Sequence, residues 1–296
     1  MGSCTKSMTA MLAALMVEQG KLRWDTTLGE AFAGSDVQLH PDFQKVTIAQ
    51  LLGHRAGIPK DMVGRPLWIK LRSGGLSPVE QRHLITQTYL GEEPVSPPGT
   101  KFEYTNVGYV IVGHIIERME GKPYEELMRE NIFKPLGLSS AGFGPPLGDA
   151  EPRGHRNGVP VSPEKRSADN PEGLAPAGRA HMSLQDWVRY AQIHLRAARG
   201  ESYELLTEAS YKKLHTPLEG QTYALGWGSP NRRWAGGRVL THVGSNTMWR
   251  CAIWIVPEKN AAILVTTNHG GDEAEAGEKE VIQTIIKQLF PTDGEQ

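Results

Sequence analysis

The chain has few cysteines, no long hydrophobic run and almost no net charge. Among its 296 residues are Cys4 and Cys251, which are too few for a disulfide framework, so both are predicted to be free thiols. A formal net charge of -1 gives no indication of a nucleic-acid or membrane-surface partner. The longest apolar stretch, 107–116, is interrupted by two glycines and a histidine and is shorter than the roughly 20 residues that span a bilayer. No transmembrane helix is therefore expected.

Metal-binding and targeting patterns are also missing. The 10 histidines form no His-Glu-x-x-His pattern and no Cys-x-x-Cys pair occurs, so a metal site is not expected. The chain as given begins without a basic and then apolar leader, so no signal peptide is expected in it. Its compartment and its oligomeric state stay open. With 39% hydrophobic and 22% charged residues, the composition is that of a soluble globular enzyme with a sizeable core.

The periodicity of apolar residues predicts an α+β fold. Helices are predicted over 5–18, 47–52, 78–90, 107–120, 124–131, 183–199, 203–215 and 274–290. Alternating patterns predict strands over 138–143, 223–227, 238–243, 248–256 and 261–267. The stretch 144–179 is rich in glycine and proline and is predicted to be a long loop. Helices in the middle and meandering strands at the end favour an antiparallel sheet flanked by helices, beside a mainly helical lobe.

The first turn of the first predicted helix places a hydroxyl beside an amine. Ser3 and Lys6 are three residues apart, so their side chains would share one face of the helix. A lysine kept partly neutral by desolvation can take the proton of a serine hydroxyl, and a helix N-terminus favours the negative charge that then develops. The structural alternative is that the serine is only a helix N-cap. Cys4, as another nucleophile, would point about 100° away from Ser3.

A phenol and an amide are predicted to lie together in a second cluster. In an extended segment Tyr104 and Asn106 point the same way, because their positions differ by two. We expect a nearby lysine to lower the pKa of Tyr104, which could then act as a proton shuttle, while Asn106 holds a substrate carbonyl group. The alternative is a helix cap with a packed aromatic ring.

A third cluster ends a predicted strand. Gly244 lets another backbone approach closely, and the N–H of Ser245 could be one of two oxyanion donors, the other being the N–H of Ser3. His242 would then face the substrate. The alternative is a surface histidine at a strand end that titrates without doing chemistry.

With these three clusters, the chain resembles the serine β-lactamase and penicillin-binding-protein superfamily, in the class C-like branch that includes β-lactamases, D-Ala-D-Ala carboxypeptidases and esterases. The matching motifs are 3–6 for Ser-x-x-Lys, 104–106 for Tyr-x-Asn, and 242–244 for the His-x-Gly form of Lys-Thr-Gly. Segments 51–59, 98–109, 132–138 and 175–178 also look like those of the family. The resemblance implies one catalytic domain over 1–296, with a helical lobe at about 20–215 and a sheet lobe at about 216–296 that includes the helix of 1–19.

The resemblance also implies a mechanism. Ser3 would form an acyl-enzyme with an ester, β-lactam or peptide-like small molecule, without a metal or a cofactor. Lys6 and Tyr104 would share the proton transfers, and which of them is the general base stays open. Asn106 would orient the substrate, and His242, Gly244 and Ser245 would complete its binding site.

Two departures from the family pattern bear on activity. The family normally has several tens of residues before its nucleophile, so we expect the sheet to lack the usual N-terminal strands, either because the given chain is a fragment or because the sheet has an open edge. This favours, as an alternative function, a catalytically impaired homologue that binds peptide or cell-wall fragments. His242 replaces a lysine, and neutral imidazole attracts a carboxylate weakly. An esterase or peptidase-like activity is therefore favoured over penicillin hydrolysis, unless Arg250 or Arg179 supplies the charge.

Overall fold

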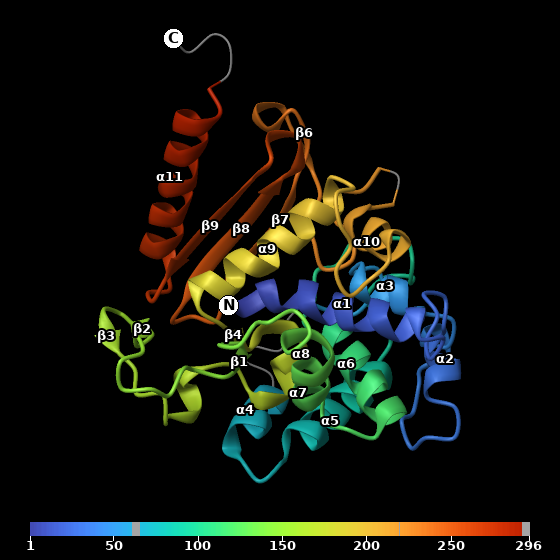
Figure 1. Ribbon diagram of the computed structural model, residues 1–296. Helices are drawn as coiled ribbons and strands as arrows, with labels where there is room; N and C mark the ends of the chain where they lie inside the picture. The colour runs from blue at the N-terminus through green and yellow to red at the C-terminus, as the bar shows by residue number, and fades with distance from the viewer. Residues whose placement is uncertain (61–65, 219, 292–296) are drawn as a thin grey trace.

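The computed structural model describes residues 1–60, 66–218 and 220–291. It has an antiparallel sheet with helices on both faces and a larger helical region beside it (Figure 1), which confirms the predicted α+β class. The main sheet has the strand order β7-β8-β9, with bounds β7 (Leu240–Ser245), β8 (Arg250–Val256) and β9 (Ala261–Thr267). In the described part of the chain, no further strand pairs with the outer edge of β9.

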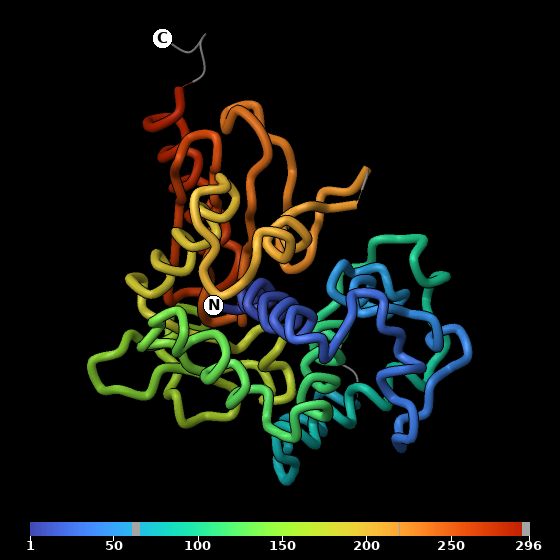
Figure 2. Tube along the Cα trace, turned by 45° about the vertical axis from the view of Figure 1, so that its right-hand side comes forward, coloured from blue at the N-terminus to red at the C-terminus, as the bar shows by residue number. Residues whose placement is uncertain are grey.

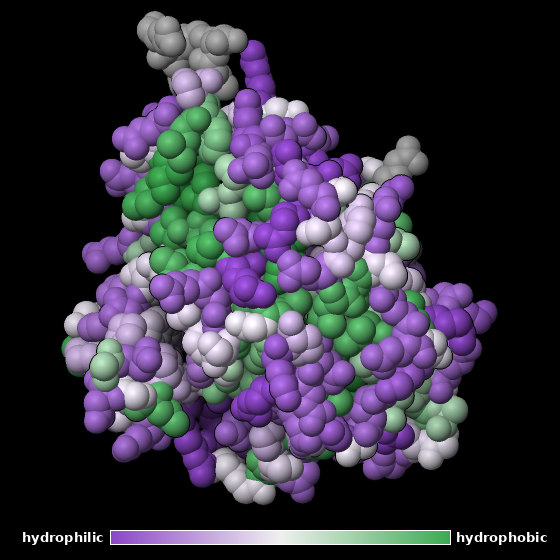
Figure 3. Space-filling model, viewed as in Figure 1, coloured by the Kyte–Doolittle hydropathy of each residue, from purple (hydrophilic) through white to green (hydrophobic). Residues whose placement is uncertain are grey.

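Side chains of β8 point alternately to the two faces of the sheet, so this strand contributes to an apolar layer on each face. Cys251 and Ile253 face the main core, to which helix α9 (Leu184–Ala198) contributes Trp187. Ala252 faces the other way and packs with Ile282 of helix α11 (Asp272–Leu289), which covers the second face of the sheet. On the side shown in Figure 3, hydrophobic side chains gather over α11 and β9. Of the helices that the structure describes, none combines the length and the apolar character needed to cross a membrane.

Helix α1 (Thr5–Glu18) lies between the sheet and the helical region in both views of the backbone (Figure 1 and Figure 2). Every residue from Thr5 to Ala14 is buried, and so is Met16. The helix contacts α6, α8 and α10, so it is covered on nearly its whole circumference. A helix that is apolar on most of its faces is stable only when it is enclosed in this way.

Smaller elements complete the helical region and its edges. The remaining α-helices are α2 (Leu28–Ala31), α3 (Ile48–Leu52), α4 (Pro66–Ser73), α5 (Pro78–Leu90), α6 (Val107–Glu120), α7 (Tyr124–Met128), α8 (Ala175–Gly178) and α10 (Glu208–His215). Two-residue strands pair as β1 (Gly142–Phe143) with β4 (Ala180–His181), β2 (His155–Arg156) with β3 (Val159–Pro160), and β5 (Asn231–Arg232) with β6 (Gly237–Arg238). Single 3-10 turns are η1 (Gly2–Cys4), η2 (Pro41–Phe43), η4 (Arg166–Ala168), η5 (Glu172–Leu174), η6 (Arg233–Ala235) and η7 (Pro257–Lys259).

Most predicted helices are present, and two differ in their extent. The helix predicted over 124–131 is α-helical only to Met128 and continues as a π-helical turn, η3 (Arg129–Phe133). The helix predicted over 203–215 begins at Glu208, because the side chain of Thr207 caps it by accepting a hydrogen bond from the N–H of Ser210.

Three other predictions need correction. The strand predicted over 138–143 is reduced to Gly142–Phe143, because its partner β4 has only two residues. Residues 223–227 do not form a strand, and Tyr223 makes only a single bridge, to Gly228. The predicted long loop, 144–179, contains the β2–β3 hairpin, two 3-10 turns and α8.

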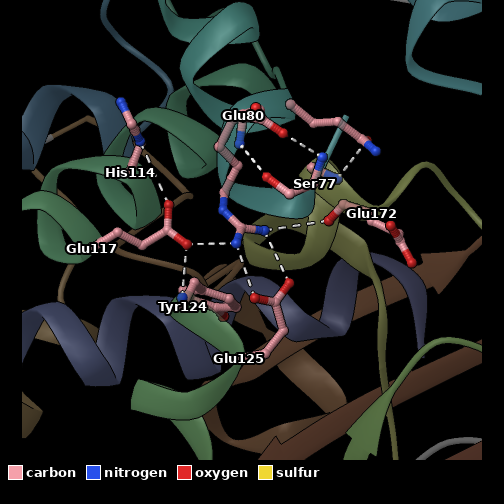
Figure 4. A network of polar contacts seen from close by, with 10 residues as sticks. Ser77, Glu80, His114, Glu117, Tyr124, Glu125 and Glu172 are labelled. Carbon is pink, nitrogen blue, oxygen red and sulfur yellow. Dashed lines mark hydrogen bonds and ion pairs between the residues drawn. The ribbon is translucent and has the colours of Figure 1, made fainter. Parts of the chain in front are cut away.

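A buried ion network joins three helices of the helical region (Figure 4). The guanidinium group of Arg82 in α5 makes two bonds of 2.9 Å to the carboxylate of Glu125 in α7 and also pairs with Glu117 in α6. Glu117 accepts a further bond of 2.7 Å from the backbone N–H of Tyr124. Arg82 is fully buried, so these partners satisfy a charge that water cannot reach.

Candidate active site

Ser3 and Lys6 lie together, as their spacing predicts. Ser3 belongs to turn η1, which leads directly into α1, and Lys6 lies in the first turn of that helix. The Thr5 hydroxyl holds the junction by donating a bond of 2.7 Å to the carbonyl of Gly2. The Nζ atom of Lys6 lies 3.0 Å from Oγ of Ser3. A half-buried hydroxyl therefore meets a buried amine at the start of the central helix.

The amine of Lys6 has only neutral partners among those that the structure records. Besides Ser3, it donates to Oδ1 of Asn106 at 2.7 Å and to the carbonyl of Ala177 at 2.8 Å. The side chain is 0% exposed, so loss of hydration disfavours the ammonium form. Burial lowers the pKa of Lys6 from 10.5 to about 7. Close to neutral pH, a large share of the molecules thus carries an uncharged amine.

The geometry around this amine suits a base. The carbonyl oxygens of Asn106 and Ala177 can only accept hydrogen bonds. A neutral amine has two hydrogens, which those two acceptors take, and its lone pair is left toward the hydroxyl of Ser3. In that protonation state the serine donates and the lysine accepts.

The phenol of Tyr104 borders the same hydroxyl. Its side chain interacts with that of Ser3, and the Nζ atom of Lys6 lies 5.0 Å from the centroid of its ring. The predicted lowering of its pKa is wrong. Burial raises the pKa of Tyr104 well above its usual value, because loss of water around the phenolate outweighs the favourable hydrogen bond. Tyr104 is a neutral phenol at neutral pH.

His54 holds the segment that carries Tyr104, a role that the sequence reasoning did not assign. Its Nδ1 atom accepts the backbone N–H of Thr105 at 3.2 Å, and its carbonyl accepts the N–H of Glu103 at 2.7 Å. The imidazole ring lies 4.3 Å from the ring of Tyr104, centroid to centroid. His54 has a positive φ of 56°, unusual for a residue other than glycine. Its position in the familial segment 51–59 was the available signal.

His242 is buried in the wall of the site and bound on both ring nitrogens. Nδ1 lies 2.8 Å from the carbonyl of Val243, which can only accept, so Nδ1 carries the hydrogen. Nε2 then accepts the hydroxyl of Tyr223 at 3.1 Å. Burial, with a smaller effect of Lys6, lowers the pKa of His242 to about 3. The imidazole is neutral, and both of its nitrogens are occupied within the protein. Tyr223 was missed in the sequence, where its segment was predicted to be a strand.

Two glycines allow turn η1 to cross strand β7 at very close range. A Cβ at Gly244 would lie 1.9 Å from the carbonyl oxygen of Met1 and 3.0 Å from the backbone N of Ser3. A Cβ at Gly2, which has a φ of 53°, would lie 2.4 Å from the backbone N of Ser245. The backbone amides of Ser3 and Ser245 therefore belong to adjoining segments, as two oxyanion donors require.

The arginines considered as substitutes for a lysine are bound elsewhere. Arg250 pairs with Glu275 at 3.1 Å and with Glu278 at 3.3 Å, both in α11, so its suggested role is not supported. Arg179 donates to the carbonyl of Asn170. In the part of the chain that the structure describes, no group of three or more histidine, cysteine or acidic side chains could hold a metal ion.

Comparisons with known proteins add a family match and a shared fold. A family model described as Beta-lactamase matches residues 1–285. The unguisins hydrolase ungD' of Aspergillus campestris is 24% identical over 314 residues, covering 97% of this chain and 55% of that protein. Penicillin-binding protein 4 of Amycolatopsis lactamdurans is 27% identical over 281 residues, covering 91% of this chain and 71% of that protein. The chain thus spans little more than half of the first relative.

A solved structure has the same fold. A D-stereospecific amidohydrolase from Streptomyces sp. aligns with a TM-score of 0.74 at 21% identity, covering 98% of this chain and 85% of that one.

Proposed function

Because this chain belongs to the beta-lactamase family, whose members are serine hydrolases, we propose that it cleaves esters or amides through an acyl-enzyme on Ser3. The observation that carries the proposal is the buried amine of Lys6, 3.0 Å from the Ser3 hydroxyl, with a pKa of about 7. A serine becomes a useful nucleophile only when a base beside it is free of its proton at working pH. A helix cap alone does not need such a partner.

In the proposed acylation, neutral Lys6 takes the proton of Ser3 while Oγ attacks the substrate carbonyl carbon. The oxygen that becomes negative accepts hydrogen bonds from the N–H groups of Ser3 and Ser245, which lie in adjoining segments. Lys6 rather than Tyr104 is the base in this scheme, since burial raises the pKa of the tyrosine and lowers that of the lysine.

Tyr104 takes the role of proton donor in the next step. As a neutral phenol that interacts with Ser3, it is proposed to protonate the leaving oxygen or nitrogen. The ammonium of Lys6, which lies beside the ring, then returns the proton to the tyrosine. Water attacks the acyl-enzyme with neutral Lys6 as the base once more, and Asn106 keeps the amine in place through its 2.7 Å bond.

We favour uncharged esters and amides over β-lactams as substrates. A β-lactam carries a carboxylate, whereas His242 is neutral and Arg250 is paired with two glutamates. The names of two similar proteins, an unguisins hydrolase and a D-stereospecific amidohydrolase, support a hydrolase, and the second supports amides as the natural class.

The test is covalent labelling of Ser3, followed by turnover. The protein is treated with a fluorophosphonate, and its intact mass is measured. Hydrolysis of a p-nitrophenyl ester and of a chromogenic cephalosporin is followed separately. We expect one adduct on Ser3, ester turnover that exceeds cephalosporin turnover, and a loss of roughly three orders of magnitude or more in Ser3→Ala.

Ser7→Ala is the matched control, because Ser7 lies on the same helix and its hydroxyl bonds to the carbonyl of Cys4. This variant should still be labelled. A folded wild-type sample that forms no adduct would reject catalysis and leave the impaired, ligand-binding homologue as the better hypothesis.

A further inference from the structure

The only two cysteines of the chain meet inside the protein, although 246 residues separate them. Their Sγ atoms are 3.6 Å apart, and the residues are 2% and 3% exposed. Cys4 directly follows Ser3, whereas Cys251 lies on β8 in register with Gly244. Neither thiol has a part in the proposed hydrolysis. The pair thus links the turn that carries the nucleophile to β8, the strand paired with β7, on which the second backbone amide lies.

The two thiols are in unequal surroundings. The Sγ of Cys4 donates to the carbonyl of His242 at 3.6 Å, and that of Cys251 to the carbonyl of Met1 at 3.2 Å. Burial raises the pKa of Cys4, while the contact with the Cys4 thiol lowers the pKa of Cys251. Cys251 is therefore the thiol that ionises first, and a thiolate is the form that an oxidant attacks.

A small oxidant has a space from which to reach this sulfur. Cys251 lines a cavity of about 380 Å³, whose wall also includes Asn246, Trp249 and Met182. Hydrogen peroxide is close to water in size, and one water molecule occupies about 30 Å³ in the liquid. The cavity can also accommodate the oxygen that a first oxidation adds to Cys251.

We propose that Cys4 and Cys251 form a reversible disulfide when the protein meets a hydroperoxide, and that this bond slows acylation of Ser3. The thiolate of Cys251 attacks one peroxide oxygen, the O–O bond breaks, and after proton transfer a sulfenic acid and water are formed. The thiol of Cys4 then attacks the sulfenic sulfur, the S–O bond breaks, and a second water leaves with the thiol proton. Two thiols are oxidised and one peroxide is reduced. The effect on Ser3 rests on the proposed hydrolase function, whereas formation of the disulfide does not.

The expected loss of activity follows from how far the two sulfur atoms must move to form a bond. The sulfur atoms must approach from 3.6 Å to about 2.05 Å, so the backbone of η1 or of β8 has to shift or the side chains have to rotate. Because Cys4 adjoins Ser3 and Cys251 is paired with Gly244, such a shift moves the nucleophile relative to the amide of Ser245. Catalytic geometry tolerates about 0.5 Å, and a misplacement of about 1 Å can cost a hundredfold. We expect labelling of Ser3 to slow by about tenfold or more.

The experiment treats the full chain with hydrogen peroxide and reads two properties separately. Non-reducing intact mass spectrometry and peptide mapping should show a loss of two hydrogens and a peptide that joins the two cysteines, both reversed by dithiothreitol. The rate of fluorophosphonate labelling should fall when the cross-link forms and recover when dithiothreitol reduces it. Cys251→Ala and Cys4→Ala, treated in parallel, control for methionine oxidation, because they can gain oxygen but cannot form the cross-link.

The outcomes separate the two parts of the inference. If both thiols remain alkylatable after peroxide treatment, the disulfide site is refuted. A cross-link that leaves the labelling rate unchanged, or a rate that falls equally in Cys251→Ala, refutes its effect on Ser3. If the reduced protein is not labelled at all, the hydrolase proposal fails, while the cross-link still reports on the cysteine pair.

Discussion

The sharpest prediction concerns the pH at which Ser3 reacts. Burial lowers the pKa of Lys6 from 10.5 to about 7, which corresponds to about 5 kcal/mol of differential free energy between its charged and neutral forms. At pH 7 about half of the molecules would then have a neutral amine, compared with roughly 3 in 10,000 for a lysine in water. If Lys6 is the base, kcat/KM should follow the neutral fraction.

The assay is the hydrolysis of an uncharged p-nitrophenyl ester from pH 5 to pH 9, corrected for spontaneous hydrolysis. We expect kcat/KM to rise about tenfold per pH unit below 7 and to level off above it, so the value at pH 5 is about 1% of the plateau. A midpoint above pH 9, or a profile that stays flat, would refute the reasoning. Lys6→Met should lose about two to four orders of magnitude in kcat/KM on the plateau above pH 7.

The same shift has a consequence for stability that does not depend on catalysis. Between pH 7 and 10.5 the unfolded chain binds a proton at Lys6 that the folded chain does not, so stability rises with pH in this window. Urea denaturation at pH 7 and pH 9 should show that the wild type gains about 2 kcal/mol over Lys6→Met. Equal pH dependence in the two proteins would mean that Lys6 has an ordinary pKa.

Three further predictions concern the frame of the site, and each is checked by chemical denaturation. Gly244→Ala should destabilise the protein by about 1–3 kcal/mol, because the new Cβ would lie 1.9 Å from the carbonyl oxygen of Met1. Gly277→Ala in α11 is the control: its Cβ meets nothing within 4 Å, so the change should be neutral or stabilising. Arg82→Met should lower the free energy of unfolding by about 3–5 kcal/mol, because it leaves the carboxylate of Glu117 buried without its cation. Adding Glu117→Gln to this variant should restore part of the lost stability. His215 has a pKa lowered to about 3 by burial, so stability should fall as the pH drops below about 6.5, and His215→Asn should flatten that slope by up to about 1.4 kcal/mol per pH unit. The same slope in His215→Asn as in the wild type would contradict this.

Local signals were sufficient for much of the fold. The predicted helices 5–18, 78–90 and 107–120 have the same bounds in the structure, because caps and periodicity act over a few residues. The strand 261–267 also agrees, since its alternation reflects one neighbouring strand and two unequal faces. Where a partner is short or distant, as for 138–143 and 223–227, a local pattern does not show it.

In the candidate site too, local features could be predicted from the sequence, whereas features that depend on tertiary packing could not. Spacing alone places Ser3 beside Lys6, and the helix does bring them together. The contact of Tyr223 with His242 depends on how the segment of Tyr223 packs against β7, so no short motif reveals it. The sign of the pKa shift of Tyr104 was predicted wrongly, because the sequence shows a nearby cation but not the depth of burial.

The enclosure of α1 bears on how the protein would lose its function on heating. The helix that begins next to Ser3 and carries Lys6 is covered by three other helices and has no exposed residue between Thr5 and Ala14. Its amide hydrogens can therefore exchange with solvent only through openings that dismantle most of the core. In hydrogen-exchange experiments α1 should belong to the slowest group of amides. Heat inactivation should then coincide with global unfolding, without an earlier stage in which only the site has melted.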